Sequence, residues 1–294
     1  MDGKTTVIAV ANNKGGTGKT SSACNLAFGL SRKLMGKDGK PKGAVLLVDL
    51  DPQGNVSDFF ALRPLVYDQD GNPDGRCVSF CLFDQLPIKQ MIVPVARDGK
   101  PTNLYVLPTS RRLEQITMLL LRDENNRLQD MNTAGFSRYR PLDEILADAL
   151  GPAMGVFRYI ILDCPPKLDA FKRAVYHFAD HVIVPTKAEY VSVAGTIEHT
   201  EDLARLVDED PDRYKARILY VLPTMVRDNQ VADREMRQVL ADTYGRDRVA
   251  NYIPDSVKVK ESPGAGGLSV FEYDPSSAPS KAYAALVNGV YARV

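Results

Sequence analysis

The segment Lys14-Gly15-Gly16-Thr17-Gly18-Lys19-Thr20 decides the fold. It stands between an apolar run, Thr6–Ala11, and a stretch of helical periodicity, Lys19–Leu34. Glycines let the backbone turn tightly and point successive N–H groups inward, and the helix start adds the positive end of its dipole. Lys19 can then contact the β- and γ-phosphates of a nucleotide, and the Thr20 hydroxyl can ligate Mg²⁺. The segment therefore predicts a phosphate-binding loop.

This loop departs from the common spelling of such loops. The usual pattern, G-x-x-x-x-G-K-[ST], would require a glycine at position 13, where the chain has Asn13. The glycines fall at positions 15, 16 and 18 instead, and a second lysine, Lys14, opens the loop.

Apolar runs that alternate with helical patterns predict the surrounding fold. Besides Thr6–Ala11, the expected strands are Ala44–Val48, Leu104–Leu107, Tyr159–Leu162, His181–Pro185 and Arg217–Leu222. Several are apolar throughout, which is typical of parallel strands covered by helices on both faces. We expect an α/β fold, a three-layer sandwich with a mostly parallel twisted sheet flanked by helices, and one domain over residues 1–294.

Three polar stretches interrupt this alternation, at residues 35–43, 66–76 and 122–140. The first two have the Gly, Asp, Asn and Pro content of surface turns. The third is charged and poorly periodic, so that a helix extension and a mobile excursion both remain open. We interpret all three as surface inserts.

The composition excludes several classes of protein. The 37 Lys and Arg residues balance 37 Asp and Glu residues, which excludes a basic protein that coats nucleic acid through its overall field. No apolar run approaches the ~18–20 residues of a membrane span, and the first residues lack the order of a signal peptide. We expect a cytoplasmic protein with reduced cysteines.

Carboxylates follow two of the expected strands. Asp49 and Asp51 come after the second strand, and Asp163 ends the Tyr159–Leu162 run. The carboxyl ends of parallel strands are where open α/β sheets bind ligands. We therefore expect Asp163 and Asp49 to support a magnesium ion that Thr20 ligates directly.

The KGGTGKT segment resembles the deviant Walker A loop of the ParA/MinD ATPases, in which a lysine opens the loop as well as closing it. The DPQGN segment at 51–55, the LDCPP segment at 162–166 and the YDPSS segment at 273–277 extend the resemblance over nearly the whole chain. DPQGN and YDPSS are similar to the ParA branch, which includes Soj, rather than to MinD.

The resemblance implies an ATPase with ATP and Mg²⁺ as cofactors. It implies that Lys14 reaches the nucleotide of the partner subunit in an ATP-dependent homodimer, that Lys19 binds the phosphates, and that Asp51 positions the attacking water. The residues implied to hold the phosphates are Gly15, Gly16, Thr17, Gly18, Lys19, Thr20 and Ser21. Those implied to wall the adenine are Met225, Pro254 and Asp255.

The resemblance also implies a biological role. ParA-type dimers bind DNA non-specifically through basic residues, work with a ParB-type centromere-binding protein, and are nucleoid-associated. The candidate DNA-binding residues are Arg227, Arg234, Arg237, Arg246, Arg248, Lys258 and Lys260. Asp255 stands where a basic residue is common in the family. Related ATPases position protein cargo through an adaptor, and the sequence leaves the cargo open.

Other functions are weaker interpretations. A MinD-like membrane switch needs a basic amphipathic C-terminal helix, whereas Ser280–Val294 has an apolar face but only two cations, so we expect that helix to pack on the core. A metal-cluster carrier would need paired cysteines, which the spacing of the four cysteines does not suggest. The intact Lys19, Thr20 and Asp51 argue against a non-enzymatic scaffold.

Overall fold

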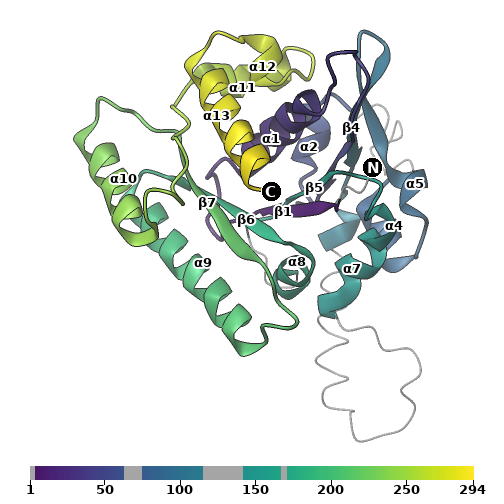
Figure 1. The fold of residues 1–294 in the computed structure, drawn as a ribbon, viewed down its shortest axis with the longest axis horizontal. Coiled ribbons are helices and arrows are strands. Elements are labelled where there is room, and N and C mark those ends of the chain that lie inside the picture. Colours follow the sequence, from purple (N-terminus) through teal and green to yellow (C-terminus); the bar gives the residue numbers. More distant parts are fainter. Residues whose placement is uncertain (1–3, 63–74, 115–141, 167–170) are drawn as a thin grey trace, which may run out of the picture.

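The computed structural model describes residues 4–62, 75–114, 142–166 and 171–294. Their centre is a seven-stranded sheet in the order β3-β4-β2-β5-β1-β6-β7 (Figure 1). The strands are β1 (Thr6–Val10), β2 (Val45–Asp49), β3 (Val93–Arg97), β4 (Lys100–Leu107), β5 (Tyr159–Asp163), β6 (His181–Lys187) and β7 (Arg217–Thr224). All neighbouring pairs are parallel except β3 and β4, which are antiparallel.

Helices connect these strands. The α-helices are α1 (Lys19–Lys33), α2 (Asn55–Phe59), α4 (Val78–Phe83), α5 (Ile88–Met91), α7 (Ile145–Leu150), α8 (Lys172–Phe178), α9 (Tyr190–Glu209), α10 (Val231–Tyr244), α11 (Val257–Gly264), α12 (Val270–Tyr273) and α13 (Ala278–Arg293). Two short 3₁₀ turns, Leu142–Glu144 and Gly151–Ala153, flank α7.

The sheet separates two apolar cores. Successive side chains of a strand point to opposite faces, so Val7 packs with α4, α7 and α8 on one face, and Ile8 packs with α1, α12 and α13 on the other. Figure 1 shows these helices on the two sides of the sheet. The predicted three-layer sandwich with a mostly parallel sheet is confirmed.

All six predicted strands are present, but the sequence analysis missed β3. Only Val93 and Val95 of this strand are buried, and Pro94 and Ala96 are exposed. A short strand that contains proline reads poorly from sequence, and such strands belong at the edges of sheets. The consequence is an antiparallel edge on an otherwise parallel sheet.

The structure tests the predictions for the inserts only in part, and it tests the prediction for the C-terminal helix fully. Residues 35–43 form a turn that an isolated bridge between Met35 and Pro41 closes, whereas the insert at 122–140 and most of the one at 66–76 lie outside the described residues. In α13, Tyr283, Leu286, Val287 and Val290 are buried against the core, as the core-packing interpretation expects. No helix in the described part of the chain is long and apolar enough to cross a membrane.

Candidate nucleotide site

The glycine-rich loop joins the end of β1 to the start of α1. Gly16 and Gly18 have φ values of 68° and 81°, a left-handed backbone that side chains other than glycine adopt at a cost. A Cβ atom at Gly15 or Gly16 would meet no other atom within 4 Å, so the loop faces open space there. This is the shape required to receive a phosphate group at a helix N-terminus.

The closing lysine, Lys19, lies largely buried under the loop. Its ammonium donates a 2.8 Å hydrogen bond to the carbonyl oxygen of Lys14. Burial lowers the pKa of Lys19, and the nearby carboxylates of Asp163 and Asp51 act in the opposite direction. The structure thus brings Lys19 and both carboxylates to one place, with the backbone of Lys14 above them.

Asp163 ends β5 and is completely buried. Within the described part of the chain neither carboxylate oxygen has a well-formed hydrogen bond, and the nearest donor is the Thr20 hydroxyl. Burial raises the pKa of Asp163 to about 7, while the Thr20 hydroxyl and the Lys19 ammonium oppose the shift. A fully buried carboxylate beside a threonine hydroxyl is a donor set that fits a magnesium ion.

Asp49 lies beside Asp163 in the register of β2 and β5. Its two oxygens accept hydrogen bonds from the backbone N–H groups of Asp51, at 3.0 Å, and Val56, at 3.3 Å. Burial and the neighbouring Asp163 raise the pKa of Asp49. Asp49 therefore holds the turn that carries Asp51. The sequence analysis predicted that Asp49 supports the metal, but it did not predict this positioning role.

Asp51 is 9% exposed, and one of its oxygens accepts a hydrogen bond from the N–H of Gln53. Its negative charge raises the pKa of the Lys19 ammonium and the pKa of Asp163, which shows that the three groups lie near one another. The end of β2 thus directs one carboxylate inward, at Asp49, and a second one, at Asp51, to the edge of the site.

A network of buried hydrogen bonds holds the loop from below. Asn12 donates to the carbonyl oxygen of Pro185 at 2.8 Å and to the hydroxyl of Thr196 at 2.9 Å, and its own side-chain oxygen accepts from the N–H of Lys14. Thr224 donates to the carbonyl oxygen of Thr17 at 2.8 Å. The sequence analysis missed this network.

A sequence signal for part of the network exists. Strand β7 ends in a Pro-Thr pair at 223–224, and β6 has such a pair at 185–186, directly before its last residue, Lys187. The hydroxyl of Thr186 accepts a 2.8 Å hydrogen bond from Thr196, and Thr224 also donates to the carbonyl oxygen of Thr186. Paired threonines at adjacent strand ends, next to a phosphate loop, mark the side chains that support the loop.

A pocket of about 320 Å³ opens beside the loop. The three residues predicted to wall the base, Met225, Pro254 and Asp255, line it together with Gly18 and Ser21. The sequence analysis assigned none of the remaining lining residues to the base, and it named Lys260 only as a DNA-binding candidate; these residues are Thr224, Ile253, Ser256, Val259, Lys260, Pro263 and Tyr283. The dimensions and the mainly apolar walls suit a nucleobase.

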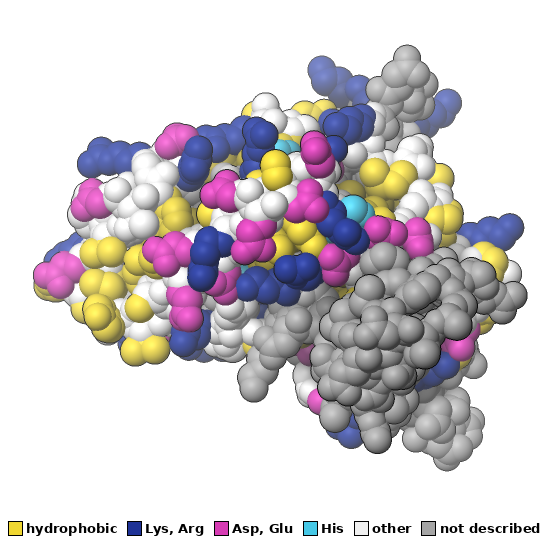
Figure 2. Space-filling model, turned by 90° about the horizontal axis from the view of Figure 1, so that it is seen from below, with side chains coloured by type: hydrophobic (Ala, Val, Ile, Leu, Met, Phe, Trp, Pro, Cys, Tyr) yellow, Lys and Arg dark blue, Asp and Glu magenta, His cyan; other side chains and the backbone are white. Residues whose placement is uncertain are grey.

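Four of the seven candidate DNA-binding cations form ion pairs with carboxylates. The carboxylate partners are Asp228 for Arg237, Asp233 for Arg227, Asp274 for Lys258 and Asp255 for Lys260, while Arg234 donates to the carbonyl oxygen of Asp228. On the face seen in Figure 2, basic and acidic side chains are interspersed. Positive charges are therefore mixed with negative charges, both on that face and around the paired candidate residues.

The comparisons with known proteins agree with this geometry. A family model described as an AAA domain matches residues 5–214. The chromosome-partitioning ATPase Soj of Thermus thermophilus is 30% identical over 98% of this chain and 96% of its own. The chromosome partitioning protein ParA of Myxococcus xanthus is 27% identical over 95% of this chain and 86% of its own.

Solved structures show the same fold. The McdA–ATP complex of Cyanothece superposes with a TM-score of 0.75 at 19% identity, covering 98% of this chain and 96% of that one. A cobyrinic acid a,c-diamide synthase from Mycobacterium smegmatis, with a bound ATP analogue and magnesium, gives a TM-score of 0.70 at 24% identity over 98% and 94%. From its phosphate loop, its sheet and its relatives, the chain belongs to the ParA/Soj-type family of P-loop ATPases.

Proposed function

We propose that this chain is an ATP-driven dimerising ATPase that binds DNA non-specifically in its ATP state and partitions plasmid or chromosomal DNA with a ParB-type partner. The observation that carries the proposal is the loop with two lysines. Lys19 is buried and belongs to its own site, whereas Lys14 is only half-buried and its ammonium has no carboxylate partner among the described residues. A second ammonium of this kind suits a nucleotide that another subunit presents.

The roles that we propose for the residues combine this geometry with the resemblance to the family. The N–H groups of residues 15–21 and the Lys19 ammonium would bind the phosphates, and the Thr20 hydroxyl would ligate Mg²⁺ with Asp163 and Asp49 supporting its water shell. Magnesium neutralises charge on the phosphates when it is bound. Asp51 accepts a hydrogen bond from the attacking water at the γ-phosphate, and Lys14 of one subunit stabilises the charge that develops in its partner's site.

The proposal that the protein binds DNA is supported by the resemblance to ParA-type ATPases and by the two sets of basic residues that a dimer would present. Each ion pair of Arg227, Arg237 and Lys260 has at least one partly exposed member, and such pairs contribute about 0–1 kcal/mol each, so phosphates can replace the carboxylates. The pair of Lys258 with Asp274 lies at the surface and is open to the same replacement. A dimer doubles the number of contacts, and the affinity then falls steeply with salt. Binding of this kind would make the ATP form nucleoid-associated.

The test uses an Asp51→Ala variant, which is expected to bind ATP without hydrolysing it. Its affinity for two unrelated DNA duplexes is measured with ATP and with ADP across a salt series. ATP-dependent, sequence-independent binding with a steep salt slope supports the proposal. A variant that dimerises with ATP but leaves DNA unbound overturns the DNA-binding step, and binding to liposomes would then be measured.

A second candidate function keeps the same cycle but moves a protein cargo. We retain this second candidate because the chain has the fold of McdA. The two functions are distinguished by identifying the partner protein that stimulates ATP hydrolysis. A protein bound to a centromere-like DNA site indicates partition, and an adaptor that binds no DNA indicates cargo positioning.

A further inference from the structure

A cleft of about 750 Å³ lies at the end of the sheet that is far from the phosphate loop. The helix α1 begins at that loop, and its last two turns reach the cleft through Phe28, Ser31 and Arg32. The other walls are the turn at 35–44, the start of β4 at 100–105, Arg97 and Val156. The nucleotide chemistry uses none of these residues.

Three exposed cations line the rim of the cleft. The side chains of Arg32, Lys42 and Lys100 form no ion pair or hydrogen bond within the described part of the chain, and no Asp or Glu lines the cleft there. The adjoining turns hold two exposed acids, Asp38 and Asp98, outside the lining. Unlike the engaged cations near α10 and α11, these charges are free to meet an anionic partner.

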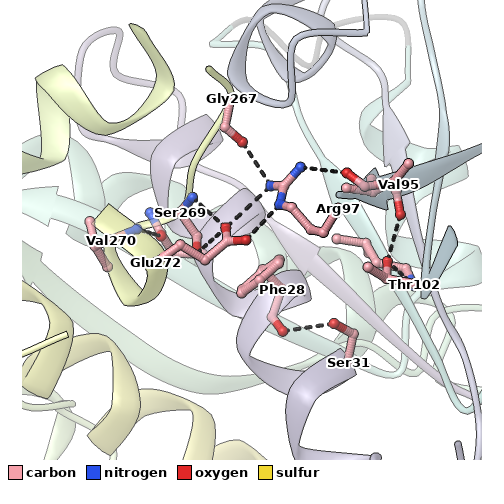
Figure 3. Close-up of polar contacts among 12 residues, drawn as sticks. Phe28, Ser31, Val95, Arg97, Thr102, Gly267, Ser269, Val270 and Glu272 are labelled. Carbon is pink, nitrogen blue, oxygen red and sulfur yellow. Dashed lines mark hydrogen bonds and ion pairs between the residues drawn. The ribbon is translucent and has the colours of Figure 1, made fainter. Parts of the chain in front are cut away.

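The fourth cation of the lining, Arg97, serves as a wall. Figure 3 shows its guanidinium directed toward Gly267 and Glu272, beside Phe28 of α1. It donates to both carboxylate oxygens of Glu272, at 2.5 and 3.2 Å, and to the carbonyl oxygen of Gly267 at 2.8 Å. It also lies 5.6 Å from the ring centre of Phe28. Arg97 therefore fixes the shape of the cleft while its own charge is neutralised.

Apolar side chains lie between the free cations. Met35 is 42% exposed and Val156 is 66% exposed. Pro41, Pro101 and Tyr105 complete an apolar surface in the same lining. Exposed apolar surface rimmed by polar or charged groups is typical of a site that binds a partner.

The shape and the charge select one kind of occupant. A compact phosphate group needs convergent donors, but the cations stand on separate flexible stems, and α1 presents its C-terminal end, the negative end of its dipole. A DNA backbone offers phosphates but no apolar side chain that would cover Met35 and Val156. We propose that the cleft docks an acidic, extended segment of a partner protein, with an apolar side chain seated between carboxylates that meet Arg32, Lys42 and Lys100.

This inference does not depend on the nucleotide cycle, so it is tested on the full chain with and without ATP. The probe is a fluorescein-labelled peptide of glutamates interrupted by two leucines, and binding is followed by fluorescence anisotropy at low salt. A second peptide has serine in place of leucine, and a third has lysine in place of glutamate. The test variant is K42E/K100E. Its control is K89E/K215E, which makes the same charge change at two exposed lysines outside the cleft.

We expect the peptide of glutamate and leucine to bind best, and K42E/K100E to weaken it by about tenfold or more because two attractions become repulsions. The control pair should change the affinity by less than about twofold, since distant surface charges are screened. Equal affinity for K42E/K100E and the native chain, equal losses in both variants, or no binding of the peptide would overturn the proposal. So would a duplex DNA affinity that falls in K42E/K100E while peptide binding persists, because the surface would then serve nucleic acid.

Discussion

The side chain of Lys14 lies over the backbone of Gly195 in α9. A Cβ atom at position 195 would lie 2.1 Å from Cε of Lys14 and 3.0 Å from its Cγ. Any residue other than glycine there would displace the lysine. The opening lysine of the phosphate loop thus rests against its own subunit in this structure, and the space it occupies exists because residue 195 has no side chain.

Two glycines within helices differ in what an added side chain would meet: the flexible Lys14 side chain at Gly195, and packed core side chains at Gly29. Gly195→Ala should change the free energy of unfolding by less than about 1 kcal/mol, because the flexible end of Lys14 can move away and alanine favours a helix. Gly29→Ala should destabilise the protein by about 1–3 kcal/mol, because its Cβ would lie 2.4 Å from Val287 and 3.1 Å from the ring of Phe271. Urea unfolding measures both, and equal effects would contradict the packing described here.

The hydroxyl of Thr224, in the wall of the pocket beside the loop, should support nucleotide binding by holding the loop. It donates to the carbonyl oxygen of Thr17, so Thr224→Val removes about 1 kcal/mol of hydrogen-bond stabilisation from the loop and weakens ATP binding by roughly fivefold. Thr243→Val removes an exposed threonine hydroxyl and should leave ATP binding unchanged. Titration calorimetry measures both affinities, and equal values for the two variants would contradict a role for Thr224 in holding the loop.

The buried His199 should make stability depend on pH. Its Nε2 faces the Tyr176 hydroxyl at 3.1 Å, and burial, followed by the Lys172 charge, lowers its pKa to about 4. An unfolded histidine takes a proton below about pH 6.5, so the unfolded state gains stability relative to the folded state as the pH falls from about 6.5 to 4. The loss reaches roughly 2 kcal/mol near pH 5.

Comparison with His199→Asn isolates this effect from the other titrating groups. The difference between the unfolding free energies of the native chain and the variant should shrink as the pH falls through this window, and should be constant above pH 7. A difference that does not change with pH would show that His199 is charged or solvated in the folded chain.

The ion pair between Arg97 and Glu272 should stabilise the fold, because it joins the edge strand β3 to α12. Both side chains are about one-fifth exposed, and Glu272 also accepts from the N–H and hydroxyl of Ser269. Arg97→Met should cost about 1–3 kcal/mol, since it leaves a half-buried carboxylate without its cation. Arg173→Met breaks a 3.9 Å pair whose arginine is 59% exposed and should cost less than about 0.5 kcal/mol. Thermal unfolding compares them, and equal losses would contradict a structural role for Arg97.

The sequence predicted the parts of the structure that local chemistry determines. The phosphate loop, six strands and α1 follow from glycine positions and apolar runs, and Lys19, Asp51 and Asp163 follow from their places after strands. The relation between Lys14 and Gly195 could not be predicted, because it joins residues far apart in sequence across a helix contact. Nor could the pairing of the predicted DNA-binding cations, since which carboxylate meets Arg237 or Lys258 depends on how the loops around α10 and α11 fold.

The most direct test of the central claim, that Lys14 acts in the site of a partner subunit, mixes two inactive proteins. Neither Lys14→Ala nor Asp51→Ala should hydrolyse ATP alone. In a mixed dimer, the Lys14→Ala subunit retains its own Lys19 and Asp51 and receives Lys14 from the Asp51→Ala subunit, so that one complete site forms. An equal mixture should therefore recover about a quarter of native turnover, since half of the dimers are mixed and each has one complete site. A mixture as inactive as its two components would contradict the account.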